Sequence, residues 1–244
     1  MEVISSLQNE RIKNLSKLLS KKFRDEEGKF LVEGEHLVEE AFKSGLLLEV
    51  IKCEDVLGEY NVPTTLVTYE VIKKLSNTVN PQRIIGVVRK IEEKELGNKV
   101  LILDDIQDPG NLGTIIRSSL AFNIDSIVLS NNSVDMYNDK VIRSSEGMIF
   151  HLNIVRKDIK ELIKELHNDG FKVYGTKVDG GTSVDKVNVT NKYAIVMGNE
   201  GNGVKDEVLD LCDDYLYIDI SDKVESLNVG VATSIILYEL NKRG

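Results

Sequence analysis

Two apolar runs near the C-terminus, each followed by a cluster of small polar residues, constrain the fold more than any other feature of the sequence. The first run, 193–197 (YAIVM), leads into 198–204 (GNEGNGV), and the second, 215–220 (YLYIDI), leads through 221–225 into 226–232 (SLNVGVA). Continuous apolar runs of this length are typical of strands buried on both faces of a parallel sheet. Ligands of such sheets bind beyond the carboxyl ends of the strands. We therefore expect the functional site where the two polar clusters lie.

Alternating strand and helix patterns in the rest of the chain predict an α/β fold with two domains. Residues 1–90 predict a small α/β domain that begins with one amphipathic helix over 5–24. The charged segment 91–98 has no apolar periodicity and is expected to be a linker. Residues 99–244 predict the second domain, with a buried strand over 100–103, a polar turn over 104–113, a helix over 114–122 and a closing helix over 233–240.

Composition excludes several classes of protein. No apolar stretch approaches the ~20 residues that a membrane-spanning helix needs, and the N-terminus lacks the apolar core of a secretory signal. The two cysteines, Cys53 and Cys212, match no metal-ligand spacing, and His151 and His167 are isolated. We expect a cytoplasmic protein with no metal site and no membrane partner.

The formal net charge of −9 argues against nucleic acid, but the distribution of charge qualifies that view. Residues 1–90 hold 14 of the 31 basic and 14 of the 40 acidic side chains, so residues 91–244 carry the whole excess of acid. The basic residues of 5–24 indicate either a solvated helix face or a surface that contacts phosphate. The polar loop 76–83 (SNTVNPQR) is either a plain connection or a place where Gln82 and Arg83 touch a substrate.

Three groups of residues in the second domain have types that suit chemistry. Asn111 and Arg117 follow a strand and a glycine-containing turn, the layout of a phosphate-binding turn, although a generic turn has the same pattern. Glu200 lies among glycines, which let a ligand approach the backbone, or it caps a helix. Ser226 and Asn228 are candidates for the same region or plain helix N-caps.

Three segments taken together resemble the signature motifs of the SpoU (TrmH) branch of the SPOUT RNA methyltransferases. They are 111–117 (NLGTIIR), 196–203 (VMGNEGNG) and 226–232 (SLNVGVA), and they occur in the order of that family. Residues 8–13 (QNERIK) and 30–34 (FLVEG) are similar to the ribosomal-protein-like substrate-binding domain often fused to it. The resemblance covers nearly the whole chain. Gly230 is a departure, since many members have a second serine there.

The resemblance implies a SPOUT α/β fold whose C-terminal segment ties a deep trefoil knot, an exception to the rule against knots. It implies a homodimer and the cofactor S-adenosyl-L-methionine. Gly198, Ile218 and Leu227 would hold this cofactor, largely through backbone groups. The same cleft would be lined by Thr176, Asn199, Gly203, Ile220 and Asn228.

The reaction that the resemblance implies is methylation of a ribose 2′-hydroxyl in RNA. Arg117 matches the family's catalytic arginine, and we interpret it as an orienting cation because arginine gives up its proton reluctantly. Asn111 would hold Arg117 or the ribose, Glu200 would fix the active loop, and Ser226 with Asn228 would order the cofactor end. The general base stays unassigned. RNA would be bound by a set of basic and polar residues: Arg11, Lys13, Lys21, Lys22, Arg24, Gln82, Arg83, Arg143 and Arg117.

The N-terminal domain favours ribosomal RNA, with 23S RNA as the expected substrate and transfer RNA as the alternative. Two other classes compete with this interpretation. One is a non-catalytic RNA-binding or ribosome-assembly protein that keeps the fold. The other is a nucleotide-dependent oxidoreductase, which requires a glycine fingerprint that 108–113 (DPGNLG) does not fit.

Overall fold

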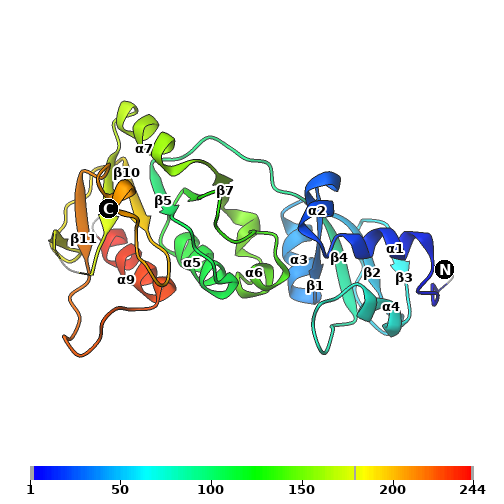
Figure 1. Cartoon of the computed structure of the whole chain (residues 1–244). Coiled ribbons are helices and arrows are strands. Elements are labelled where there is room, and N and C mark those ends of the chain that lie inside the picture. Colours follow the sequence, from blue (N-terminus) through cyan, green and yellow to red (C-terminus); the bar gives the residue numbers. More distant parts are fainter. Residues whose placement is uncertain (1–2, 179, 243–244) are drawn as a thin grey trace. The chain divides into compact units, whose positions relative to one another are not determined.

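The computed structural model describes residues 3–178 and 180–242, and the chain divides into two compact units (Figure 1). One unit comprises the chain up to Glu92 together with Asp135–His151. The other comprises Glu93–Val134 together with the chain from Leu152 onward. Residues 90–98, between β4 and β5, contain no helix or strand. The division differs from the predicted one because a segment from the second half of the sequence belongs to the first unit.

The first unit is built on a four-stranded sheet in the order β1-β4-β2-β3. β4 pairs antiparallel with both β1 and β2, and β3 joins β2 in parallel. The buried strand positions include Phe30, Val50 and Val88, which are fully covered. The elements up to Glu92 are α1 (Glu10–Lys17), α2 (Lys21–Glu27), β1 (Lys29–Glu33), α3 (Glu35–Lys43), β2 (Leu47–Lys52), β3 (Thr64–Leu66), α4 (Tyr69–Lys74) and β4 (Ile84–Arg89).

The helix predicted over 5–24 is in fact two helices, α1 and α2, so the prediction of one helix was wrong. Asn9 caps α1 by accepting from the backbone N–H of Arg11 at 2.9 Å. The guanidinium of Arg24 donates to the carbonyls of Leu18 and Leu19 at 3.0 and 2.8 Å, just beyond the end of α1. Carbonyls at the C-terminal end of a helix lack partners within it, so Arg24 stabilises the break between the two helices.

Residues 135–151 pack against β1 of the first unit. They include α6 (Asp139–Ser144) and the 3-10 turn η1 (Met148–His151). The ring of Phe30 on β1 lies 4.7 Å from that of Tyr137 and 6.2 Å from that of Phe150. Asp135 forms an ion pair with Arg24 at 2.7 Å, and both side chains are largely buried. Burial of these aromatic rings explains why the segment belongs to this unit.

The second unit is built on a seven-stranded sheet in the order β7-β6-β5-β10-β8-β11-β9. Every pairing between the described strands is parallel. The sheet confirms the α/β class and the parallel arrangement predicted from the apolar runs. Its elements are β5 (Lys99–Leu103), α5 (Pro109–Ala121), β6 (Ser126–Leu129), β7 (Asn153–Arg156), α7 (Ile159–Asn168), β8 (Lys172–Thr176), β9 (Thr182–Ser183), β10 (Tyr193–Met197), α8 (Asp206–Leu209), β11 (Asp214–Tyr217) and α9 (Val229–Asn241).

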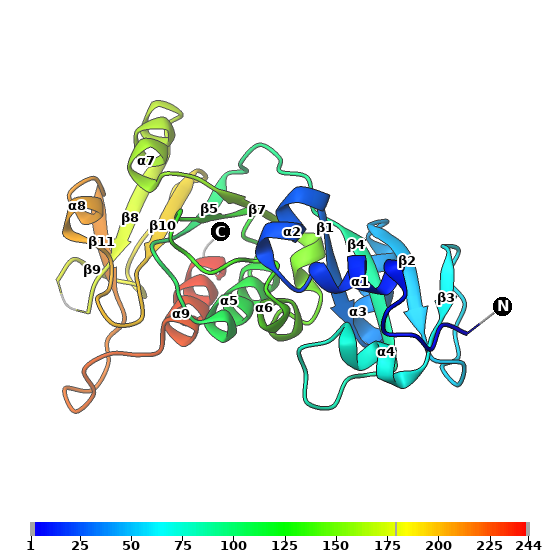
Figure 2. The same ribbon diagram turned by 45° about the vertical axis from the view of Figure 1, so that its right-hand side comes forward.

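Helices cover both faces of this sheet, with α5 and α9 side by side on one face and α7 on the other (Figures 1 and 2). Val100 and Ile102 of β5 belong to the core beneath α7, with Ile163 and Leu166 of that helix. Successive side chains of a strand point to opposite faces, so Leu101 and Leu103 face α5 and α9. Both faces of β5 are therefore apolar and buried, as the sequence predicts.

The boundaries next to the site differ from the predicted ones. α5 begins at Pro109, inside the predicted turn, because Asp108 caps it by accepting from the N–H groups of Gly110 and Asn111 at 2.7 and 3.0 Å. β11 ends at Tyr217, so residues 218–220 are not part of the strand. α9 begins at Val229 rather than 233. The trefoil knot stays a prediction, since strand order alone does not establish it. None of the described helices is long and apolar enough to span a bilayer.

The buried pair of Arg24 and Asp135 yields a stability prediction. Replacing Arg24 with Met removes the donor and leaves the Asp135 carboxylate buried, which costs about 3 kcal/mol of unfolding free energy. The matched control is Lys22→Met on the same helix, whose ion pair with Glu26 is exposed; its effect is expected within about 0.5 kcal/mol. Urea unfolding measures both. Equal stability of the two variants would contradict a structural role for Arg24.

Candidate cofactor and active site

A cavity of about 300 Å³ lies in the second unit, beyond the carboxyl ends of β8, β10 and β11. Ligand pockets in parallel α/β sheets occupy this edge. The loop after β10 and the segment between β11 and α9 form its walls. The lining includes all the residues predicted to bind cofactor except Asn228: Thr176, Gly198, Asn199, Gly203, Ile218, Ile220 and Leu227.

The loop after β10 closes on itself and needs glycine at two positions. A Cβ on Gly198 would lie 2.0 Å from the carbonyl carbon of Gly203 and the nitrogen of Val204, a distance no side chain tolerates. Gly203 has φ 68°, in the left-handed region that glycine adopts without strain. The backbones of Asn199 and Gly203 exchange hydrogen bonds of 2.9 and 3.0 Å. The loop therefore presents bare backbone to the cavity.

Glu200 joins this loop to the turn that precedes α5. Its carboxylate accepts from the backbone N–H groups of Gln107 and Asp108, at 3.2 and 3.0 Å, and from Nδ2 of Asn111 at 3.0 Å. N–H groups at the start of a helix carry partial positive charge and attract an anion. The carboxylate therefore fixes the position of the loop relative to α5.

Asn111 and Asn228 extend this contact to the start of α9. Nδ2 of Asn228 donates to Oδ1 of Asn111 at 2.9 Å. Oδ1 of Asn228 caps α9 by accepting from Gly230 and Val231 at 2.9 and 3.3 Å. Three segments that are far apart in the sequence thus meet through one chain of hydrogen bonds: Glu200 to Asn111 to Asn228.

Burial and hydrogen bonding act in opposite directions on the pKa of Glu200. Burial raises the pKa, while the hydrogen bonds from Asn111 and the backbone of Asp108 and Gln107 lower it, and the net result lies below the ordinary value of 4.5. A carboxylate with a lowered pKa is a weak base. Glu200 is therefore an anchor at neutral pH and a poor proton acceptor.

The structure does not bring Arg117 into this cluster. Arg117 is exposed on α5, six residues after Asn111. Six residues correspond to about 600° of rotation, so the two side chains leave different faces of the helix. In the described part of the chain, Arg117 has no hydrogen bond or ion pair with Asn111, Glu200 or Asn228. The expectation that Asn111 holds Arg117 is therefore not met, and the amide of Asn111 is used by Glu200 and Asn228 instead.

Most residues predicted to contact RNA lie on the first unit, where their side chains meet carboxylates. The prediction that Arg24 contacts RNA was wrong, because its guanidinium is buried in the first unit and cannot reach a phosphate. Gln82 is exposed beside Arg83 in the loop 76–83. The ion pairs are Arg11–Glu49 at 2.7 Å, Lys13–Glu10 at 3.0 Å, Lys21–Asp25 at 2.7 Å, Lys22–Glu26 at 3.8 Å, Arg83–Asp55 at 3.2 Å and Arg143–Asp139 at 2.6 Å.

Some lining residues were not identified from the sequence. Val229, Ala232 and Ile236 of α9 line the cavity, and their spacing of three and four residues places them on one helix face. That spacing could have indicated that these residues share a cavity wall, but the same spacing is typical of a helix face packed in the core. Glu225 was also not identified, and it lines the cavity beside Ser226, which was a predicted site residue; both are exposed.

The His, Cys, Asp and Glu side chains of the described residues are those that metal and thiol chemistry would use. Over 3–178 and 180–242, no three His, Cys, Asp or Glu side chains gather as a metal site would require. Burial raises the pKa of Cys212 to about 12, so its thiol stays protonated at neutral pH.

Comparison with known proteins identifies the family. Residues 98–238 match the SpoU rRNA methylase family, and residues 9–86 match the MRM3-like substrate-binding domain. The first match spans more than half of the chain, which therefore belongs to the SpoU rRNA methylase family. The family resemblance of the three sequence motifs is thereby confirmed.

Individual relatives match over almost the full length. A *Bacillus subtilis* protein named 23S rRNA (guanosine(2553)-2′-O)-methyltransferase RlmP is 38% identical over 98% of this chain and 99% of its own. The AdoMet-bound rRNA methyltransferase from *Sinorhizobium meliloti* is 26% identical, with a TM-score of 0.86 over 99% of this chain and 97% of its own. A crystallised RNA 2′-O ribose methyltransferase is 28% identical, with a TM-score of 0.85 over 99% of both chains.

The surroundings of Glu200 predict how it titrates. Because its pKa is lowered, its charge contributes stability that is complete above pH 4.5 and is lost as the pH falls through the lowered pKa. Carbon-detected NMR of the side-chain carboxyl should give a midpoint below 4.5. Replacing Asn111 with Ala removes a donor and should raise that midpoint, whereas Asn123→Ala, at the far end of α5, should not. A wild-type midpoint at or above 4.5 would contradict the network.

Proposed function

We propose that this protein is an S-adenosyl-L-methionine-dependent methyltransferase that methylates a ribose 2′-hydroxyl of 23S ribosomal RNA. One observation carries the proposal: the motif segments 196–203 and 226–232 line one cavity, and the third segment, 111–117, is joined to both by the hydrogen bonds of Asn111 with Glu200 and Asn228. Membership of the SpoU family and the full-length match to the *Bacillus* enzyme support the reaction and the substrate. The guanosine for which that enzyme is named is the first nucleotide to examine.

The cavity suits the proposed cofactor. Its apolar walls include Ile218, Ile220 and Leu227, and the closed loop of 198–203 offers backbone groups rather than bulky side chains. An adenine ring needs a flat apolar slot with a few polar partners. Bound S-adenosyl-L-methionine supplies an activated methyl group on a sulfonium. The cofactor-binding set is Thr176, Gly198, Asn199, Gly203, Ile218, Ile220, Leu227 and Asn228.

In this mechanism the side chains position the RNA and leave the cofactor to supply the reactive group. The guanidinium of Arg117 binds phosphate and stabilises negative charge on the ribose oxygen. Glu200 and Asn111 hold the loop and the helix start in register, and Ser226 with Asn228 orders the segment at the cofactor end. The proton of the 2′-hydroxyl leaves to a base that we do not assign.

The proposal includes a homodimer. It would give a role to Arg117, which makes no hydrogen bond or ion pair with Asn111, Glu200 or Asn228 within the described residues of one chain. Thr114 and Arg117 are exposed on α5, which packs against α9. On α9, Val231 and Tyr238 are each 47% exposed although they are large and apolar. Exposed apolar side chains of this kind are typical of interfaces. A second copy that covers this face would bring Arg117 to the boundary between protomers. The trefoil knot and a cytoplasmic location complete the proposal.

The first unit is proposed to bind the RNA. Its exposed cations are held in ion pairs that contribute little, since such pairs are worth about 0–1 kcal/mol in water. Phosphate can therefore replace the carboxylates at low cost. Arg143 lies in the same unit, on α6, and lines a groove with Ser76 and Asn77.

The loop 76–83 is also suited to contact RNA because hydrogen bonds to Glu33 hold its conformation. The carboxylate of Glu33 accepts from Oγ1 of Thr78 and the backbone N–H of Gln82, each at 2.9 Å, and from Ser76. Val79 at its tip is 95% exposed. Amide side chains such as that of Gln82 carry both a donor and an acceptor, as base edges require.

Ribose-methylation mapping tests the function. Total RNA from cells without the gene should lack one 2′-O-methyl mark in 23S RNA that wild-type cells carry. Replacing Arg117 with Ala should abolish the mark, while S-adenosylhomocysteine still raises the melting temperature of the variant. Lys164→Ala on α7, an exposed cation away from the cavity, is the control and should keep the mark. A wild-type pattern in the deletion strain would refute the function, and full activity of Arg117→Ala would remove that residue from the mechanism.

Salt dependence tests the RNA surface. Changing Lys13, Lys21 and Lys22 together to Gln should weaken RNA binding and lower the slope of log affinity against log salt by about 2, because about 0.7 counterion is released per contact with single-stranded RNA. Fluorescence anisotropy with a labelled 23S fragment measures both quantities. The control triple, Lys164, Lys186 and Lys192 to Gln in the second unit, has the same charge change. An equal loss in both triples would show that net charge, not this surface, governs binding.

A further inference from the structure

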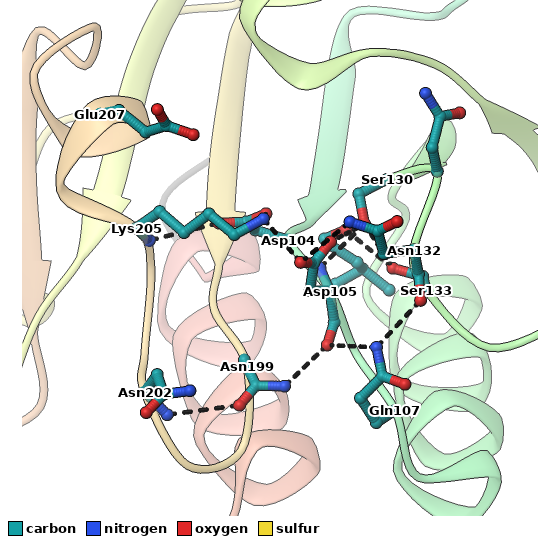
Figure 3. Close-up of polar contacts among 12 residues, drawn as sticks. Asp104, Asp105, Gln107, Ser130, Asn132, Ser133, Asn199, Asn202, Lys205 and Glu207 are labelled. Carbon is teal, nitrogen blue, oxygen red and sulfur yellow. Dashed lines mark hydrogen bonds and ion pairs between the residues drawn. The ribbon is translucent and has the colours of Figure 1, made fainter.

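Both ends of the cofactor loop are held by one residue, Asp105, which follows β5. Nδ2 of Asn199, at the start of the loop, donates to the carbonyl of Asp105 at 2.8 Å. Nζ of Lys205, at its end, donates to the carboxylate of Asp105 at 2.6 Å and lies 3.4 Å from that of Asp104. Figure 3 shows the two loop residues reaching this point from opposite ends of the loop. The residues between them include Glu200, Gly201, Asn202 and Gly203, which line the cavity.

The backbone of Asp105 adopts a conformation that is uncommon for a residue with a side chain. Its φ is 58°, in the left-handed region, where the Cβ of an L-residue crowds the backbone. Ser130 holds it there from both sides: the N–H of Asp105 donates to Oγ of Ser130 at 2.9 Å, and that Oγ donates to Oδ1 of Asp105 at 2.6 Å. Strained residues that their surroundings fix are concentrated at functional sites. The conformation turns the carbonyl toward Asn199 while the carboxylate meets Lys205.

The cluster contains one ammonium, that of Lys205, and two carboxylates, those of Asp104 and Asp105. Asp104 is buried with 2% exposure and accepts from the backbone N–H of Lys205 at 3.2 Å. Burial raises the pKa of Asp105, but hydrogen bonds from Lys205, Ser130 and Asn132 outweigh it and leave the pKa below its ordinary value. The hydrogen bond with Asp105 raises the pKa of Lys205. The ammonium of Lys205 therefore faces two carboxylates whose side chains are 3% and 18% exposed, although its own side chain is 44% exposed.

The loop itself has little that would keep it in place. Residues 200–203 are exposed, and two of the four are glycine, the residue that loses the most conformational freedom on ordering. Within the loop, the backbones of Asn199 and Gly203 exchange hydrogen bonds, and Oδ1 of Asn199 accepts from the N–H groups of Gly201 and Asn202. The loop is attached to the rest of the fold by Glu200 at one point, by the buried Val204, and by the contacts with Asp104 and Asp105 at its ends. Lys205 is not among the residues that line the cavity, so any effect on a ligand passes through the loop.

We infer that Asp105 and Lys205 are positioning residues for S-adenosyl-L-methionine: together they clamp the loop of 198–203 in the closed shape that forms the cofactor cavity. The inference rests on the proposed function in one respect, the identity of the ligand. An ordinary surface ion pair would stabilise the fold slightly and leave binding unchanged. The clamp instead changes the affinity for cofactor more than the rate of transfer from a saturated enzyme.

The test compares Lys205→Gln with a matched control, Lys160→Gln. Lys160 forms an ion pair of 2.6 Å with Glu207 and its side chain is 45% exposed, against 2.6 Å and 44% for Lys205 with Asp105. Isothermal titration gives the dissociation constants for S-adenosyl-L-methionine and S-adenosylhomocysteine, and initial rates give kcat and KM. Lys205→Gln should raise Kd and KM for the cofactor about ten-fold, the effect of one lost charged hydrogen bond. Its kcat at saturating cofactor should stay within about two-fold.

Two further variants and one further readout separate the clamp from general loss of structure. Lys205→Arg keeps a cation that can reach both carboxylates and should recover most of the affinity. Asp105→Asn keeps a residue that tolerates the left-handed region but loses the charge, and should resemble Lys205→Gln. Amide hydrogen exchange of 199–203 should be faster in Lys205→Gln than in Lys160→Gln.

Three results would overturn the inference: unchanged cofactor affinity in Lys205→Gln, an equal loss in Lys160→Gln, or a fall in kcat with KM unchanged. A lower melting temperature with wild-type affinity would show a purely structural ion pair. The wild-type Kd is measured first. A wild-type protein that does not bind the cofactor refutes the proposed function, whereas normal wild-type binding that Lys205→Gln retains refutes only the clamp.

Discussion

The carboxylate of Glu200 is the interaction on which the site depends. It lies in a glycine-rich loop with little packing of its own, and it accepts from the backbone N–H groups of Gln107 and Asp108 and from Asn111. Two of these donors lie in the turn that precedes α5 and the third in its first turn, at the end of the helix where the peptide dipoles favour an anion. Asn111 in turn accepts a hydrogen bond from Asn228, which caps α9. One charge therefore sets the positions of two helices and the loop between them.

The parallel sheet follows from local sequence because strand and core are specified by the same residues. The runs 100–103 and 193–197 are apolar at every position, and both strands are buried on two faces. The parallel-sheet pattern predicted that the clusters of Glu200 and Asn228 lie at the same edge, but the contacts of Asn111 with them were expected only through the family resemblance, since hydrogen bonds between residues 89 and 117 positions apart leave no periodic signal. The cofactor-lining residues of α9 had a signal, but it was shared with an ordinary core face.

The misplaced features have physical causes that lie outside the local pattern. The break between α1 and α2 depends on Arg24. The sequence predicts an exposed cation there, but the side chain is buried against the carbonyls of Leu18 and Leu19 and against Asp135. α5 begins early because Asp108 and Pro109 form a cap and a first turn, a signal that the glycine content of the segment obscured. Arg117 was expected beside Asn111, yet the rotation of a helix over six residues separates them.

The assignment of Asp135–His151 to the first unit has a consequence for how the protein can be taken apart. The chain passes from one unit to the other three times, near residues 92, 134 and 151, rather than once at a linker. A fragment cut at the linker would carry Phe30 without Tyr137 and Phe150, the rings that cover it. The first unit therefore cannot be exchanged between relatives by replacing only the part of the chain before the linker. A chimera that keeps the core of the first unit intact must also replace Asp135–His151, a short stretch that lies in the second half of the sequence.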